Sequence, residues 1–202
     1  SVRLNPKAKL RDTSAWYHVV VSYDSTQSTS SDRIKAYING SQLTDFDTSN
    51  YPSLNEDSLF NVNGTVVHVG RRASSAEHYY MGYMVEMIFT DGYNYTPSTF
   101  GSTNANGVWV PNVNPSVTYG NNGFRLQFAN SGSSADANGF GADTSGNNNH
   151  LASNALGTYP NTKDTPQSNF ATINLLSQQP SNPCSITEGG LKAENTSSAN
   201  TD

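Results

Sequence analysis

Carboxylate spacing is the first chemical feature of this chain to examine, because paired carboxylates hydrolyse glycosidic bonds. A retaining glycosidase needs two carboxyl groups about 5–5.5 Å apart, a separation that alternate residues on one strand face provide. Glu86 lies in an apolar stretch, but position 88 is Ile88 and Asp91 follows in a turn-forming Asp-Gly pair. Since no second carboxylate accompanies Glu86, the sequence predicts that the chain is not an enzyme.

Glu86 itself needs a partner, because a carboxylate inside an apolar strand is costly unless it is hydrogen-bonded or paired with a cation. The sequence favours a structural buried carboxylate over a ligand contact or an exposed position at a sheet edge. Its candidate partners are two arginines and two histidines: Arg71, Arg72, His18 and His68.

Asp143 opens a second polar cluster, the oxygen-rich run Asp-Thr-Ser-Gly-Asn-Asn-Asn. Calcium prefers such oxygen ligands, so Asp143 and Asn147 are candidate metal ligands. The run contains only one carboxylate, however, and Asp and Asn side chains also bond to their own backbone in Asx turns. The sequence favours an Asx-turn network and indicates no cofactor, with a calcium site as the alternative. The four histidines show no zinc-binding spacing.

Aromatic side chains next to cations form the third cluster, because sugar sites combine aromatic rings with polar side chains. Tyr79 and Tyr80, together with Arg71 and Arg72, are the candidate carbohydrate-binding residues. The alternative is that these rings pack at the rim of the fold or against a neighbouring chain. The other loop aromatics are Tyr51, His78, Tyr93, Tyr95 and Tyr119.

The composition predicts the kind of scaffold that holds these clusters. Hydrophobic residues make up 34% of the 202 residues and charged residues 13%, whereas aromatic residues reach 10% and the net charge is only −5. This composition suits a β protein with long Asn-, Ser- and Gly-rich loops rather than a disordered chain. The absence of basic clusters argues against nucleic-acid binding, and no apolar run is long enough to insert into a membrane.

Alternation of apolar residues predicts an all-β fold with no long helix. Ile34, Ala36 and Ile38 are expected to face the core, and Asn39-Gly40 indicates a hairpin turn. Thr96 and Pro97 predict a single helical turn. The predicted strands cover residues 16–23, 34–38, 65–70, 81–90, 108–110, 124–128 and 169–175.

Four of these segments appear in an order that resembles a known family. They read Trp-Tyr-His-Val-Val-Val, Arg-Ile-Lys-Ala-Tyr-Ile-Asn-Gly, His-Val-Gly-Arg-Arg and Gly-Tyr-Met-Val-Glu-Met-Ile-Phe. The order resembles the second half of a concanavalin A-like, laminin-G-type lectin or glucanase domain. Val85 departs from the pattern, since the family usually has Asp there. The later segments, including Asp-Thr-Ser-Gly-Asn at 143–147, resemble bacteriophage tail-fibre and appendage proteins.

The resemblance implies an antiparallel jelly-roll β-sandwich, here expected as an excerpt that lacks its N-terminal strands. It divides the chain into a lectin-like sandwich (1–130), a loop-rich extension (131–178) and a linker to a following domain (179–202). It implies a non-enzymatic adhesion module on the virion surface or in the extracellular space, which displays a surface for host glycans. The partners implied are other virion proteins and further copies of the chain, with a trimer favoured. The alternatives are an architectural spacer or capsid-decoration module and a non-catalytic part of a polysaccharide depolymerase.

Overall fold

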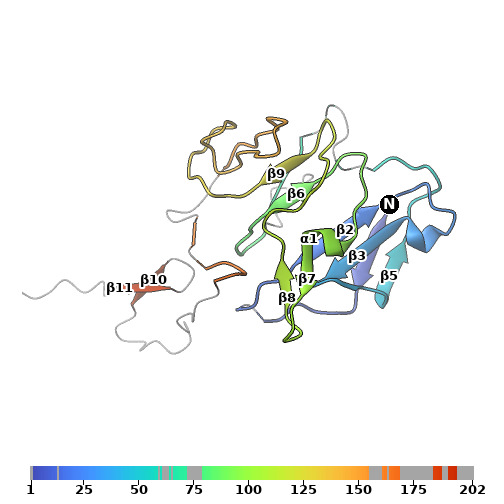
Figure 1. The fold of residues 1–202 in the computed structure, drawn as a ribbon, viewed down its shortest axis with the longest axis horizontal. Coiled ribbons are helices and arrows are strands. Elements are labelled where there is room, and N and C mark those ends of the chain that lie inside the picture. Colours follow the sequence, from blue (N-terminus) through green and yellow to red (C-terminus); the bar gives the residue numbers. More distant parts are fainter. Residues whose placement is uncertain are drawn as a thin grey trace, which may run out of the picture.

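The computed structural model describes residues 2–12, 14–58, 60, 64, 66–71, 79–154, 161–162, 164–168, 184–187 and 191–194. Within these ranges the chain forms short strands joined by long loops, together with one single-turn α-helix and one 3-10 turn (Figure 1). Each pair of named strands is antiparallel. The all-β prediction is therefore confirmed.

The described strands form five small sheets. One sheet has three strands, in the order β2 (Val19–Tyr23), β3 (Ile34–Ile38), β4 (Ser41–Gln42). The other four are two-stranded: β1 (Arg3–Pro6) with β5 (Phe46–Asn50), β6 (Met87–Phe89) with β9 (Phe124–Leu126), β7 (Gly101–Thr103) with β8 (Trp109–Pro111), and β10 (Ser185–Thr187) with β11 (Lys192–Glu194).

The predicted hairpin at Asn39-Gly40 is confirmed. Both residues have positive φ, 48° and 78°, which is the conformation that a two-residue type I′ turn requires. The turn joins β3 to β4, with Ile38 opposite Ser41. The helical turn is also confirmed as α1 (Pro97–Phe100), with Pro97 in its first turn. Thr96 makes no side-chain cap bond, because its hydroxyl instead lies 2.8 Å from the Ser98 hydroxyl.

The two faces of the three-stranded sheet differ in burial. Val20 is 9% exposed, whereas Val19 and Val21, on the other face, are 55% and 62% exposed. Ile34, Ala36 and Ile38 share the face of Val19 and Val21 and are only half-buried. The expectation that this face lies in a core is therefore only partly met, because the better-covered face is the one that carries Val20.

The hairpin of β7 and β8 covers part of the Val20 face. The ring of Trp109 lies so close to the Gly40 Cα that an added Cβ would clash with it, and its centroid is 5.5 Å from that of His18. Glycine is therefore needed at position 40 for the close approach as well as for the turn. Figure 1 shows α1, β7 and β8 in front of β2 and β3.

The tightest packing surrounds β6 and β9. Leu126 is fully buried and Phe124 is 3% exposed, and the Phe124 ring lies against Phe89 at 5.6 Å. Both strands are shorter than predicted. β6 begins at Met87 because Glu86 has a positive φ of 54°, and β9 ends at Leu126 shortly before Phe128, whose φ is 55°. Left-handed conformations interrupt a strand, so residues 81–86 and 127–128 are loop.

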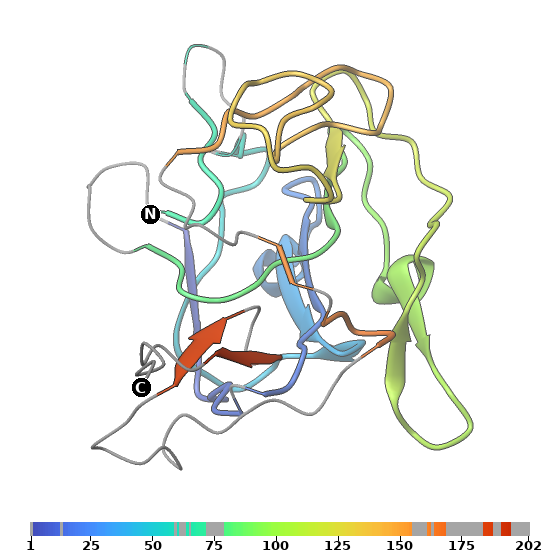
Figure 2. The same ribbon diagram turned by 90° about the vertical axis from the view of Figure 1, so that its left-hand side faces the viewer.

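The loops after β9 pack beside it, away from the β7–β8 hairpin (Figure 2). Asp143 forms a β-bridge with Leu126, and Trp16 Nε1 donates to Asp164 Oδ2 at 3.1 Å, a contact between residues 148 apart in the sequence. The sequence predicts a strand at 65–70, but residues 66–70, the described part of this range, form no strand. The strand predicted at 169–175 lies outside the described residues. Within the range expected to be a linker, β10 and β11 form a small hairpin.

Candidate functional site

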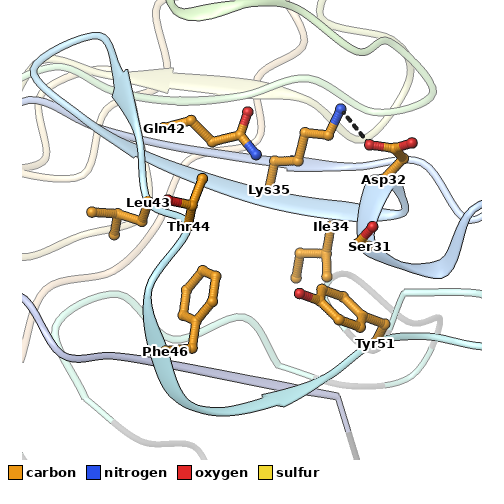
Figure 3. A pocket seen from close by; sticks show the side chains of 9 residues that line it. All are labelled: Ser31, Asp32, Ile34, Lys35, Gln42, Leu43, Thr44, Phe46 and Tyr51. Atoms are coloured by element: carbon orange, nitrogen blue, oxygen red, sulfur yellow. Dashed lines mark ion pairs between the residues drawn. The ribbon is translucent and has the colours of Figure 1, made fainter.

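A pocket of about 220 Å³ opens between the three-stranded sheet and the strand β5 (Figure 3). It combines side chains from the 3-10 turn η1 (Ser30–Asp32), from β3, from β4 and from the segment that continues through β5. We call it the β3–β5 pocket. Its lining residues are Ser31, Asp32, Ile34, Lys35, Gln42, Leu43, Thr44, Phe46 and Tyr51.

The wall of the β3–β5 pocket is apolar and its rim is polar. Figure 3 shows the rings of Phe46 and Tyr51 on one side of the opening, facing Ile34. The Tyr51 hydroxyl points toward the space between Ile34 and Phe46. Gln42 and Thr44 contribute an amide and a hydroxyl to the rim, and within the described part of the chain neither side chain has a hydrogen-bond partner. These groups are therefore available to a ligand.

The Arg33 side chain holds one side of the pocket in place. Three bonds from the Arg33 guanidinium to the carbonyls of Gln27, Ser28 and Pro52, at 2.8–3.0 Å, tie the loop before β3 to the segment that carries Tyr51. Pro52 is fully buried. The Tyr51 ring thus stands on a fixed backbone.

Phe46, the other ring on this side of the pocket, is held where the chain turns from β4 into β5. Asp45 pairs with Lys7 at 2.7 Å, and the Lys7 amide donates to the Asp45 carbonyl at 3.1 Å. A register shift at Pro6 places that residue opposite Phe46. These contacts fix the turn that presents Phe46.

The rim of the pocket carries a cation and an anion that neutralise each other. Lys35 Nζ lies 2.9 Å from Asp32 Oδ1, and the hydrogen bond to Asp32 raises the pKa of Lys35. Lys35 therefore stays protonated at neutral pH, and the paired charges leave the rim with donors and acceptors but no net charge. Such a rim suits a neutral polyhydroxylated ligand better than a strongly charged one.

The predicted carbohydrate cluster is only partly assembled in the described structure. Arg71 forms a β-bridge with Tyr79, and the Tyr80 amide donates to the Gly70 carbonyl at 2.7 Å. Tyr79 and Tyr80 are 58% and 54% exposed, and the Tyr80 hydroxyl donates to the Tyr83 carbonyl at 3.1 Å. Arg72 lies outside the described residues. We call Arg71, Tyr79 and Tyr80 the tyrosine surface.

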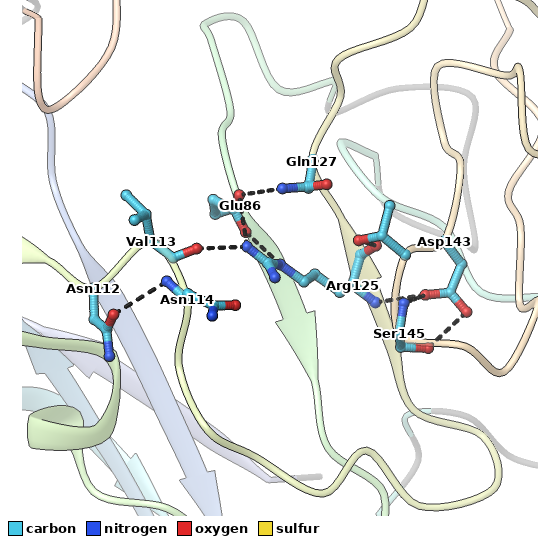
Figure 4. A network of polar contacts seen from close by, with 9 residues as sticks. Glu86, Asn112, Val113, Asn114, Arg125, Gln127, Asp143 and Ser145 are labelled. Carbon is cyan, nitrogen blue, oxygen red and sulfur yellow. Dashed lines mark hydrogen bonds and ion pairs between the residues drawn. The ribbon is translucent and has the colours of Figure 1, made fainter.

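Glu86 has partners that the sequence did not identify. Arg125 donates to both of its carboxylate oxygens, through Nε at 2.9 Å and Nη2 at 3.2 Å, and Gln127 Nε2 donates at 3.0 Å (Figure 4). The hydrogen bonds that Arg125 donates to Glu86 raise the pKa of Arg125. The candidate partners Arg71, His18 and His68 make no contact with Glu86 among the described residues, and Arg72 is outside them. The Glu86 side chain is half-buried, with 29% exposed.

Asp143 is the centre of a loop that is closed by backbone amides. Its carboxylate accepts hydrogen bonds from the amides of Arg125, Ser145 and Asn149 and from the Ser145 hydroxyl, all at 2.8–2.9 Å. Burial raises the pKa of Asp143, but these hydrogen bonds together outweigh burial and hold the pKa below its usual value. This is the geometry of the Asx-turn network.

Asn147, the second candidate metal ligand, also binds backbone groups, but as a donor. Its Nδ2 group donates to the carbonyls of Gly120 and Gly123 at 2.6 and 2.9 Å, and Asn149 Nδ2 also reaches Gly123. In the ranges that the structure describes, no three His, Cys, Asp or Glu side chains come together as a metal site. The calcium site stays a prediction. To bind there, Ca²⁺ would have to displace hydrogen bonds that the Asp143 carboxylate already accepts.

Comparison with protein-family models, curated proteins and solved structures finds no match to this chain. No helix in the described part of the chain is long and apolar enough to cross a membrane.

The β3–β5 pocket is the functional feature that sequence reasoning missed. Tyr51 is among the loop aromatics, but Phe46, Gln42 and Lys35 come from three different elements. The turn at Asn39-Gly40 reverses the chain from β3 into β4, which brings Gln42 beside β3. This turn is the one part of the arrangement that the sequence could signal, since Phe46 and Tyr51 reach the pocket through contacts between distant segments.

Proposed function

We propose that this chain is a non-enzymatic adhesion module of a virion, built on a concanavalin A-like jelly roll, that binds a sugar of a host glycan in the β3–β5 pocket. The ordered motifs of the sequence support the virion and jelly-roll parts of the proposal. The antiparallel strands agree with such a fold. One structural observation carries the binding function: a concave site joins two aromatic rings to the Gln42 amide and the Thr44 hydroxyl, which have no hydrogen-bond partner in the part of the chain that the structure describes.

The chemistry of a sugar ring matches this lining. A pyranose has an apolar C–H face that packs on an aromatic ring, and its edge carries hydroxyls that need hydrogen-bond partners when they leave water. Phe46 and Tyr51 supply the aromatic surface, and Gln42 and Thr44 supply the partners. The volume of about 220 Å³ is below the ~300–1,000 Å³ of pockets for larger ligands, which suits one ring of a glycan chain.

A glycan array tests the proposal with the full chain and two variants. Tyr51→Phe removes a hydroxyl from the pocket, so we expect about fivefold weaker binding to the best glycan, or ~1 kcal/mol. Tyr93→Phe is the matched control, because Tyr93 is 49% exposed and lies outside the pocket. It should leave binding unchanged.

Two array results would contradict the proposed site or function. Binding that survives Tyr51→Phe and Phe46→Ala but fails in Tyr79→Ala would move the site to the tyrosine surface. An array without any bound glycan would overturn the adhesin proposal and favour the architectural spacer. Release of reducing sugar from a host polysaccharide by the chain would instead favour the depolymerase.

A further inference from the structure

The hydrogen bonds of the three-stranded sheet show which backbone groups of β2 are used. The Asn39 amide donates to the His18 carbonyl at 2.8 Å, and the Asp24 amide donates to the Arg33 carbonyl at 2.8 Å. Both pairs fit the register of β2 against β3. Because hydrogen-bonded pairs alternate along an antiparallel ladder, residues at even positions from 18 to 24 direct their backbone groups toward β3.

The odd positions of β2 therefore direct their backbone groups the other way. Val19, Val21 and Tyr23 place their amides and carbonyls along the outer edge of the sheet, which we call the β2 edge. Among the described residues, β3 is the only strand that pairs with β2. Within the described ranges, the β2 edge is thus a row of backbone donors and acceptors without a neighbouring strand.

The β2 edge has none of the usual features that keep edges from pairing. Residues 16–23 contain no Asp, Glu, Lys, Arg or Pro, and the register from Val19 to Tyr23 is regular, without a bulge. By contrast, β1 contains Arg3, Pro6 and a register shift. Val19 and Val21 are exposed beside the open backbone groups. Burying both would favour pairing.

The pattern of the β2 edge is complementary to itself. A twofold axis through Val21 would place the Val21 residues of two copies opposite each other and each Val19 opposite Tyr23 of the other copy. All three pairs would use outward-facing backbone groups, and their side chains would lie on one face. Because residues 16–23 contain no Asp, Glu, Lys or Arg, no pair of like charges meets along the two strands in this register.

We propose that the β2 edge pairs antiparallel with the β2 edge of a second copy of this chain, centred on Val21. The result is a continuous six-stranded sheet and a twofold dimer. The β3–β5 pockets lie on the far side of β3 in each copy, so the pairing leaves both open. One rigid sheet then carries two pockets, although the pairing does not depend on what the pockets bind.

Mass measurement of the full chain in solution tests the proposal. Only five residues of each strand meet, so we expect a weak dimer, half-formed at roughly 10–100 μM. Sedimentation equilibrium at several concentrations should give a mass that rises from one copy to two. A single copy at all concentrations would overturn the proposal, and so would a three-copy mass, which the tail-fibre resemblance favours.

Variants at Val21 test whether the β2 edge forms the contact. Val21→Pro removes an outward amide and no bond to β3, and proline is tolerated at such an edge position. Val21→Lys adds a charge to the edge as a second, independent variant. Both should weaken the dimer at least tenfold while circular dichroism and the melting temperature stay close to wild type. Val108→Lys is the matched control, because Val108 is 57% exposed and lies outside β2. A dimer that persists in folded Val21→Pro and Val21→Lys would contradict the assignment.

Cysteine crosslinking tests the register. In a background of Cys184→Ser, which removes the exposed natural thiol, Val21→Cys would bring two Cα atoms about 5.5 Å apart, a distance that a disulfide spans. Mild oxidation should yield a covalent dimer from Val21→Cys and none from Val108→Cys. Absence of that dimer would overturn the twofold register. Slow hydrogen exchange at Val19 and Val21 in a monomer would assign the edge to a segment of the same chain instead.

Discussion

The β6–β9 sheet and the β2–β3–β4 sheet achieve burial in different ways. Around β9, Leu126 and Phe124 are almost completely buried, and beside them the Asp143 carboxylate accepts hydrogen bonds from the backbone amides of Arg125 and Asn149. On β2, Val19 and Val21 stay largely exposed. A chain with few hydrophobic residues thus builds its tightest region from a few apolar side chains enclosed by Asp and Asn, and leaves a more apolar strand partly uncovered.

Of the substitutions that compare the two sheets, truncation of the buried Leu126 should have the largest effect on stability. We expect Leu126→Ala to lower the free energy of unfolding by about 2–5 kcal/mol, because the cavity lies in tightly packed surroundings. Val21→Ala, at an exposed position, should cost less than about 0.5 kcal/mol at concentrations where the chain is monomeric. Urea unfolding measures both, and equal losses would show that the two regions are packed alike.

Replacement of the buried carboxylate should come next. In Asp143→Asn, an NH2 group replaces one carboxylate oxygen and faces groups that donate to that carboxylate in wild type. We therefore expect the free energy of unfolding to fall by about 1–3 kcal/mol. The lowered pKa of Asp143 means that its contribution is present above the usual value of 3.8 and is lost as pH falls through the folded-state pKa. The variant should therefore lose less stability than wild type on acidification. An unchanged acid profile in urea unfolding would contradict this role.

A matched pair of threonine substitutions sharpens the contrast between the two faces of β2. Val20→Thr places a hydroxyl on the covered face and should cost about 1–2 kcal/mol, whereas Val21→Thr on the exposed face should change stability by less than ~0.5 kcal/mol. Thermal unfolding at low protein concentration provides the measurement. A larger loss at Val21 would reverse our assignment of the covered face.

The smallest expected effect concerns His18, which lies under the β7–β8 hairpin. Burial lowers its pKa below the usual 6.5, and its Nδ1 has no hydrogen-bond partner among the described residues. The unfolded chain therefore binds a proton more readily, so stability should fall as pH drops below 6.5 and level off below the folded-state pKa. His18→Phe keeps a ring against Trp109 and should flatten this part of the pH profile. A profile identical to wild type would exclude His18 as its source.

Short-range signals in the sequence were sufficient for the turns but not for the site. Asn39-Gly40 and Pro97 act through their own backbone preferences, so both were predictable. Alternation alone extended the predicted strand back to Met81, but Glu86 adopts a left-handed conformation to meet Arg125, 39 residues away. The pocket depends on similar contacts between distant segments, since Arg33 holds the backbone at Pro52. No local pattern records such contacts.

The position of Trp109 over Gly40 and Gly101 has an optical consequence. Its indole nitrogen is buried without a partner among the described residues, so its fluorescence reports an apolar environment while the β7–β8 hairpin lies on the sheet. Any event that lifts the hairpin lets water reach the indole and shifts the emission to longer wavelength. A Trp16→Phe variant would leave Trp109 as the single emitter, since the chain contains two tryptophans. The molecule thus contains its own probe of how firmly its layers stay together.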